Sequence, residues 1–165
     1  MNAPSSKKTS STQVNLWVDV ALFAAIMTVL APSSAQELHV MLHDALSLAA
    51  EGPVAIRYPN GAARQVGELE VGTGLAANRL RSGDASACIL AVGRLVGAAL
   101  KAADQLAERG VAATVWDVRS CAPLDAAMLD DAAAHRVVVT CEDGVRDGGI
   151  GMAMFGEIAR RDEST

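Results

Sequence analysis

Apolar and polar positions follow two different rhythms along this chain. Short apolar runs at residues 54–58, 87–92, 111–118 and 136–141 have the length and continuity of buried strands. Residues 35–50, 95–109, 126–134 and 150–160 instead repeat apolar side chains at the three- and four-residue spacing of amphipathic helices. Regular alternation of such strands and helices predicts a three-layer α/β/α fold with a mostly parallel sheet.

Local signals mark the ends of several predicted helices. Ser34, followed three residues later by Glu37, has the form of a capping box for the first helix. Gly110 is suited to end the helix over 95–109, because glycine readily adopts the left-handed conformation found there. Asp125 is a favourable N-cap for the helix that follows it.

Changes in residue composition divide the chain into segments. Residues 1–14 are polar and are predicted to form a disordered tail, and residues 16–26 and 27–31 are predicted as a short helix and a strand. A glycine-rich stretch over 62–73 is predicted to be a linker, followed by a strand at 74–80. We therefore expect one unit over 15–61 and a second over 74–165.

The first thirty-five residues also imitate a secretory signal. Lys7 and Lys8 precede an apolar run at 20–31, and small residues follow it. Asp19 at the start of the run disfavours this interpretation, and the run is shorter than the roughly 20 residues that span a membrane. We expect a cytoplasmic protein; a secreted protein that begins near Gln36 is the alternative, and intact mass would distinguish them.

Composition narrows the function. Hydrophobic residues make up 51% and charged residues 20% of the 165 residues, which excludes disorder throughout. A formal net charge of −5 disfavours nucleic-acid binding through a basic field. Aromatic residues are only 3%, so the core must be built from Val, Ile, Leu and Ala rather than around an aromatic groove.

The cysteines and histidines do not have the spacing typical of a metal site or of a nucleophilic catalytic site. The three cysteines, Cys88, Cys121 and Cys141, are far apart and are interpreted as small buried hydrophobes in a reducing compartment. His39 and His43 lie four residues apart but lack a third ligand, so we interpret them as surface histidines. We therefore predict no catalytic and no metal-binding residue.

Six segments in order resemble one enzyme family. They are PVAIRYPNG at 53–61, ILAVG at 89–93, GV at 110–111, ATVWDVR at 113–119, APLD at 122–125 and VVTCEDGVRDGGIG at 138–151. The set resembles the C-terminal portion of 1-deoxy-D-xylulose-5-phosphate synthases, which are thiamine-diphosphate enzymes. The resemblance implies a transketolase-type C-terminal domain over 74–165, preceded by the end of a pyrimidine-binding domain over 15–61.

The resemblance also implies a chemistry. The family is a transferase that condenses pyruvate, with loss of CO2, onto glyceraldehyde 3-phosphate for isoprenoid precursor synthesis, using thiamine diphosphate and Mg²⁺. It implies that Arg57 binds the substrate phosphate, for which a guanidinium fork is well suited. The alternative for Arg57 is a surface salt bridge at a strand end.

The sequence departs from the family pattern, because it does not contain the family's cofactor-binding motif. The Gly-Asp-Gly motif that binds the cofactor's diphosphate is not found, since Gly83 and Asp84 lie in a turn without the downstream Asn. We expect no cofactor for this chain alone and no synthase activity. Two hypotheses remain: a C-terminal fragment of the synthase, or a non-catalytic assembly subunit of a split enzyme. Either is expected to form a homodimer or to join a separate catalytic subunit, without nucleic-acid or membrane partners.

Overall fold

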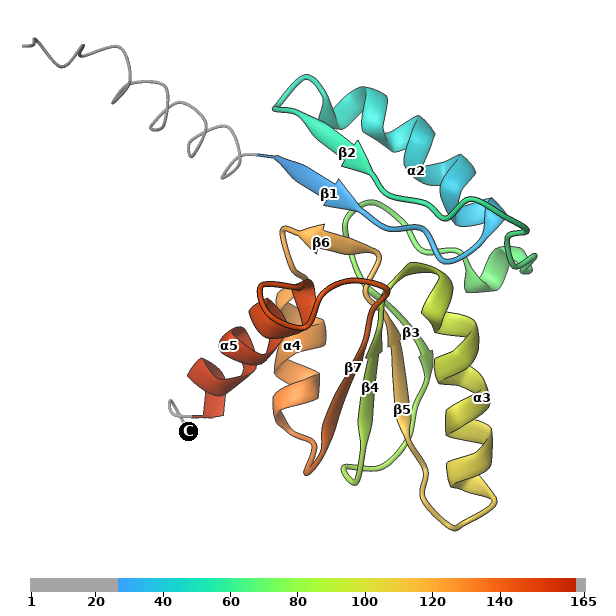
Figure 1. Ribbon diagram of the computed structural model, residues 1–165, viewed down its shortest axis with the longest axis vertical. Helices are drawn as coiled ribbons and strands as arrows, with labels where there is room; N and C mark the ends of the chain where they lie inside the picture. The colour runs from blue at the N-terminus through green and yellow to red at the C-terminus, as the bar shows by residue number, and fades with distance from the viewer. Residues whose placement is uncertain (1–26, 163–165) are drawn as a thin grey trace, which may run out of the picture.

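The computed structural model describes residues 27–162, which contain two sheets, the first lying across one end of the second (Figure 1). The predicted tail over 1–14 and the predicted helix over 16–26 lie outside the described residues. None of the helices in the described range is long and apolar enough to cross a membrane.

The first sheet has three strands in the order β2-β1-β6. Its strands are β1 (Thr28–Leu30), β2 (Val54–Ile56) and β6 (Ser120–Ala122). Helix α2 (Ala35–Leu48) connects β1 to β2, and these two strands pair in parallel. β6 pairs antiparallel with β1, although about ninety residues separate them in the chain. The first sheet is therefore completed by a strand from the later part of the sequence.

The second sheet has four strands in the order β3-β5-β4-β7. Its strands are β3 (Asn78–Arg81), β4 (Cys88–Ala91), β5 (Thr114–Asp117) and β7 (Val138–Cys141). β5, β4 and β7 are parallel, and β3 is antiparallel at one edge. Helix α3 (Val96–Ala107) covers one face, and α4 (Ala126–Ala133) and α5 (Ile150–Asp162) lie on the other (Figure 1). The expected three-layer α/β/α architecture with a mostly parallel sheet is confirmed.

The core lies on both faces of the central strand β4. Cys88 and Leu90 pack toward α4 and α5, in a cluster that includes Met128 and Met154. Ile89 and Ala91 pack toward α3, in the other cluster. Every residue of β4 is buried, which is why the strand reads as continuously apolar rather than alternating.

The helix ends follow most of the predicted signals. Ser34 Oγ accepts a hydrogen bond from Glu37 N at 3.1 Å, and Asp125 Oδ1 accepts one from Met128 N at 3.0 Å. Gly110 has a φ of +80°, which glycine adopts without steric cost. The second half of the predicted capping box is wrong, because the side chain of Glu37 turns into the protein instead of back to the Ser34 backbone.

Two strand predictions differ from the structure. The strand expected over 74–80 begins only at Asn78, and β6 lies in the stretch between the predicted strand over 111–118 and the predicted helix over 126–134. β6 has three residues and no apolar alternation, and it forms only because β1 offers a free edge in space. Strands of this kind depend on long-range pairing rather than on local propensity.

Candidate functional site

Arg57, the predicted phosphate-binding residue, follows directly after β2. Its backbone N–H donates to Leu30 O at 2.8 Å, which continues the pairing of β2 with β1. The side chain is exposed and reaches the second sheet, where Nη2 donates to the backbone oxygen of Asp143 at 2.6 Å. The guanidinium thus lies between the two sheets, with donors remaining for a ligand.

The surroundings of Arg57 are built from strand ends. β1, β2, β4 and β7 are followed by Ala31, Arg57, Val92 and Glu142, so the carboxyl ends of four strands meet at one crevice. A small cavity of about 80 Å³ lies there, lined from both sheets, with Arg57, Arg94 and Asp143 in its wall. Crevices at the carboxyl ends of parallel strands are common ligand sites in α/β proteins.

Arg94 is the second cation of this crevice. It lies in the 3₁₀ turn η2 (Gly93–Leu95) between β4 and α3. Its Nε lies 2.9 Å from Oδ2 of Asp143, so both arginines contact the same residue. Gly93 has a φ of +56°, which favours glycine, and a Cβ added there would lie 3.6 Å from Pro32 O, so the turn packs beside the end of β1.

A larger cavity of about 860 Å³ adjoins the first. Arg94 and Tyr58 line both cavities, and Arg64, Ser33 and Asn60 add polar groups to the larger one. Arg64 Nη1 pairs with Glu70 at 2.9 Å, whereas its buried Nε has no hydrogen-bond partner among the described residues. The two cavities therefore form one crevice with three guanidinium groups in its wall.

A buried ionic network lies between the two sheets. Arg119 Nε donates to Glu37 Oε2 at 2.9 Å, and neither side chain is exposed. Arg119 Nη1 also donates to three backbone oxygens, those of Thr73, Gly74 and Ala76. This one side chain therefore joins α2, the segment that leads into β3, and the end of β5.

Asp117 completes the network from the last position of β5. Its side chain accepts hydrogen bonds from the Ser33 hydroxyl and, at 3.3 Å, from the Arg119 backbone N–H. Burial, helped by the negative charge of Glu37, raises the pKa of Asp117 to about 7 against the opposing effects of the Ser33 hydrogen bond and of Arg119. The network thus contains two carboxyl groups for one guanidinium.

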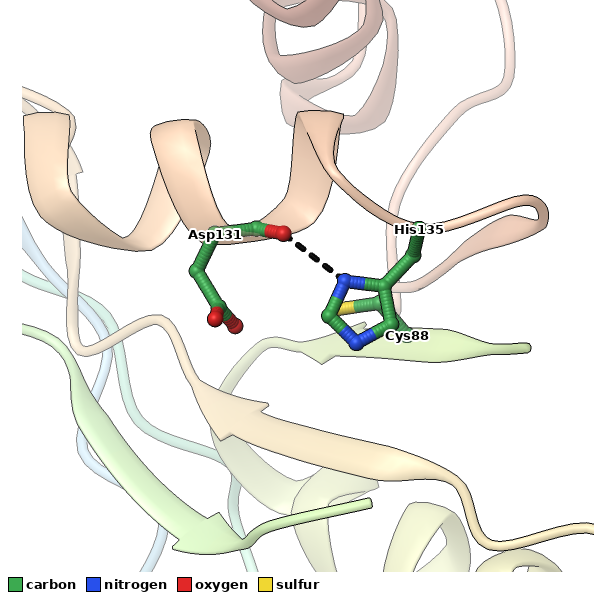
Figure 2. A group of neighbouring side chains, drawn as sticks. All are labelled: Cys88, Asp131 and His135. Atoms are coloured by element: carbon green, nitrogen blue, oxygen red, sulfur yellow. Dashed lines mark hydrogen bonds between the residues drawn. The ribbon is translucent and has the colours of Figure 1, made fainter. Parts of the chain in front are cut away.

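Cys88, Asp131 and His135 form the one group of metal-ligand type found among the described residues (Figure 2). His135 Nδ1 lies 2.7 Å from Asp131 O, so it donates, and Nε2 then accepts from the Thr114 hydroxyl at 3.0 Å. Asp131 contacts Arg79 and accepts from Trp116 Nε1 at 2.7 Å. Burial raises the pKa of the Cys88 thiol to about 12. These contacts fit a structural link between α4 and β5 rather than a metal site.

The acidic side chains Asp84 and Glu142 do not form a site for a cofactor diphosphate and its cation. Asp84 Oδ1 accepts from Ser86 N at 2.8 Å in an exposed turn, and Gly83 packs against the backbone of Ala112 and Ala113. Glu142 accepts from the N–H groups of Ile150 and Gly151, at 3.3 and 2.9 Å, and so caps α5. Each of these acidic side chains serves a turn or a helix end.

The histidines lie on the surface as the sequence predicts, whereas only one of the three cysteines is fully buried. The buried ionic network was not predicted. His39 and His43 are exposed on α2. Cys88 is buried, while Cys121 and Cys141 are half-buried, and all three are free. Nothing in the local sequence marks Glu37, Asp117 and Arg119 as a unit, because the contacts that join them span more than eighty residues. Arg94 was missed as well, since nothing in its local pattern separates it from a surface arginine.

Comparisons with known proteins agree with this architecture. The family model "Transketolase, C-terminal domain" matches residues 75–162. The chain is 43% identical over 141 residues to a 1-deoxy-D-xylulose-5-phosphate synthase of Anaeromyxobacter sp. (strain K), covering 82% of this chain and 22% of the relative. It is 39% identical over 140 residues to that of Magnetococcus marinus, with the same coverage. The chain thus spans about a fifth of the length of these curated relatives.

A solved structure described as "Split gene transketolase, inactive beta4 tetramer" is also similar. It superposes with a TM-score of 0.74 at 29% identity and covers 86% of this chain and 48% of that one. The family match covers more than half of the chain, and the identity to curated synthases extends the likeness upstream to α2 and the first sheet. The chain therefore belongs to the transketolase C-terminal domain family and matches the C-terminal portion of 1-deoxy-D-xylulose-5-phosphate synthases.

Proposed function

We propose that this chain is the C-terminal portion of a 1-deoxy-D-xylulose-5-phosphate synthase-type transferase, in which Arg57 binds the phosphate of glyceraldehyde 3-phosphate. The observation that carries the proposal is the position of Arg57, exposed at the carboxyl end of β2 in a crevice between two sheets. The identity of about 40% to curated synthases over most of the chain supports it.

In this proposal Arg57 orients the substrate. Its guanidinium is anchored by one donor to Asp143 O at 2.6 Å, so its direction is held before a ligand arrives. The other donors form two parallel hydrogen bonds to phosphate oxygens, which set both the position and the rotation of the sugar phosphate. Thiamine diphosphate, bound by residues outside this set, supplies the carbanion chemistry in the complete enzyme.

A domain replacement tests this role. Residues 27–162 replace the matching segment of the Anaeromyxobacter sp. (strain K) synthase, and product formation from pyruvate and glyceraldehyde 3-phosphate is measured. We expect an active chimera in which Arg57→Ala raises the KM for glyceraldehyde 3-phosphate at least about tenfold, as for loss of a charge-assisted contact. The KM for pyruvate should change little.

The matched control is Arg109→Ala, which removes the same charge from an exposed position beyond the end of α3. A folded chimera without activity, or an Arg57→Ala chimera with an unchanged KM for the sugar phosphate, would contradict the proposal.

By itself the chain is proposed to be inactive, because Asp84 serves a turn and Glu142 a helix end rather than a diphosphate site. Calorimetric titration of the isolated chain with Mg²⁺ and thiamine diphosphate should show no tight binding. Tight binding in that titration would overturn the proposed inactivity while leaving the role of Arg57 intact.

The second candidate is a non-catalytic assembly subunit that forms a homodimer or docks on a separate catalytic chain. It is favoured by the likeness to a split-gene transketolase described as a tetramer. It is also favoured by the edge strand β7, in which Val139 is 44% exposed and which Val137, 47% exposed, directly precedes. An apolar edge strand readily pairs with another chain.

Light scattering of the purified chain tests the assembly. We expect a dimer or larger species that Val139→Lys shifts toward the monomer, because a charge on an edge strand opposes pairing. The control Arg109→Lys keeps the charge at a nearby exposed position. A monomer at all concentrations would contradict self-assembly.

A further inference from the structure

The crevice between the two sheets has more cationic character than Arg57 alone supplies. Arg57 comes from the first sheet and Arg94 from the second, and both line the smaller cavity. The strand ends that carry them belong to β2 and β4. Two guanidinium groups from separate units thus face one cavity of about 80 Å³, a volume suited to a group of oxyanion size.

The start of α3 adds to the positive potential. Leu95 occupies the N-cap position and makes no side-chain hydrogen bond to the helix, and the first turn contains no acidic residue. Gly97, in this first turn, lines the larger cavity together with Arg94. The start of this twelve-residue helix therefore borders the same crevice as the arginines, with the partial positive charge of a helix N-terminus.

Arg64 adds a third guanidinium to the wall of the crevice, in its larger cavity. Its Nε is buried and has no hydrogen-bond acceptor within the part of the chain that the structure describes. A buried donor without an acceptor is unfavourable unless water or a ligand supplies one. Because this Nε is covered by protein, Arg64 adds positive charge to the wall of the larger cavity rather than a direct contact from that atom.

We propose that Arg94 is a second guanidinium for the anion that Arg57 binds, so that the crevice holds a phosphate monoester between the two sheets. The inference rests on the phosphate role proposed for Arg57 and adds Arg94, which follows β4 of the second sheet, as another phosphate-binding residue. Two forked donors on opposite sides of a phosphate fix its orientation better than one.

Asp143 holds the place of the anion in the free protein. Its carboxylate lies 2.9 Å from Arg94 Nε, with side-chain exposures of 52% and 58%. Ion pairs this exposed are weak, so a phosphate can replace the carboxylate at little energetic expense. Arg57 contacts the backbone oxygen of Asp143 instead, and this contact persists when the carboxylate is displaced.

Nuclear magnetic resonance titration of the full chain tests the proposal. The probes are inorganic phosphate and glycerol 3-phosphate at constant ionic strength, with glycerol as the uncharged control, and the arginine Nε–Hε signals report on the site. We expect saturable binding that shifts Arg57 and Arg94. Stronger binding of glycerol 3-phosphate than of phosphate would show that the ligand is a monoester.

Three variants separate the contribution of Arg94 from general charge. Arg94→Ala should weaken binding about tenfold or more, as for a charge-assisted contact. Arg94→Lys keeps the charge without the fork and should give an intermediate loss. Asp143→Asn removes the competing carboxylate and should tighten binding. Arg109→Ala, with the same charge change as Arg94→Ala, should leave it unchanged.

The outcomes also separate this inference from the function proposed above. Binding that Arg57→Ala weakens and Arg94→Ala leaves unchanged would overturn the role of Arg94 and support that of Arg57. The absence of saturable binding, or an equal loss of affinity in Arg109→Ala and Arg94→Ala, would likewise overturn the phosphate-binding role of Arg94. The chimera assay decides the role in the synthase independently of these results.

Discussion

Arg119 Nε donates a hydrogen bond to Glu37 Oε2 at 2.9 Å, and both side chains are fully buried between the two sheets. Buried ion pairs of this kind are expensive to break, because removal of one partner leaves an uncompensated charge away from water. Glu37 Oε1 also accepts from Gly72 N at 2.5 Å. The contact thus joins the first sheet's helix to the segment that leads into the second sheet.

Loss of Arg119 should destabilise the protein strongly. We expect Arg119→Ala to lower the free energy of unfolding by about 3–5 kcal/mol, because Glu37 and Asp117 then face each other without a cation. Urea unfolding followed by circular dichroism measures the change. Arg81→Ala is the matched control: it breaks an exposed ion pair with Asp104, and should change the value by less than about 1 kcal/mol. Equal losses in the two variants would show that the buried pair has no special role.

Asp117 should make the stability depend on pH. Its pKa is about 7 in the folded protein and near 3.8 when unfolded, so the unfolded state loses its proton first as the pH rises. This group's contribution to stability is therefore complete below about pH 4 and is lost as the pH rises toward 7, on the order of a few kcal/mol.

The variant Asp117→Asn isolates that contribution, because asparagine keeps an acceptor for Ser33 but does not titrate. The difference in unfolding free energy between the variant and the natural protein should grow in favour of the variant from pH 4.5 to 7.5. A difference that stays constant over this interval would exclude titration of Asp117 as its source.

Gly72 should tolerate no side chain. A Cβ at this position would lie 2.5 Å from Arg119 Nε, so Gly72→Ala must displace the guanidinium from Glu37. We expect a loss of about 1–3 kcal/mol in unfolding free energy, typical of overpacking at a buried contact. Gly67→Ala, where nothing lies within 4 Å of the added Cβ, is the control and should be close to neutral. If both variants unfold alike, the close approach of Gly72 to Arg119 is not a constraint.

His135 should act through hydrogen bonds and not through a metal. His135→Ala removes contacts to Asp131 O and to the Thr114 hydroxyl, and should lower the free energy of unfolding by about 1–3 kcal/mol. His39→Ala, on the exposed surface of α2, should have no such effect. Addition of Zn²⁺ or of a chelator should leave the melting temperature unchanged; a rise with Zn²⁺ that His135→Ala abolishes would show a metal site after all.

Much of the fold was predictable because it is local. β4 is buried on both faces and therefore appears as an uninterrupted apolar run, and α3 shows the period of a helix with one face on the sheet. Ser34, Gly110 and Asp125 act through neighbours a few residues away, so their roles as helix-end signals are visible in sequence. Arg57 was singled out differently, because the segment around it resembles a known family, and its phosphate role stays a proposal.

The rest depends on contacts that only folding creates. β6 forms because β1 leaves an edge unpaired, and Glu37, which the local pattern assigns to a cap, instead meets Arg119 eighty-two residues later. Arg94 resembles any exposed arginine until β2 and β4 end at the same crevice. The sequence by itself determined the layers and the helix ends, since short-range periodicity and capping chemistry encode them. Only the tertiary structure brought the buried network together and placed Arg94 beside Arg57, because the energies of burial and of charge depend on neighbours distant in the chain.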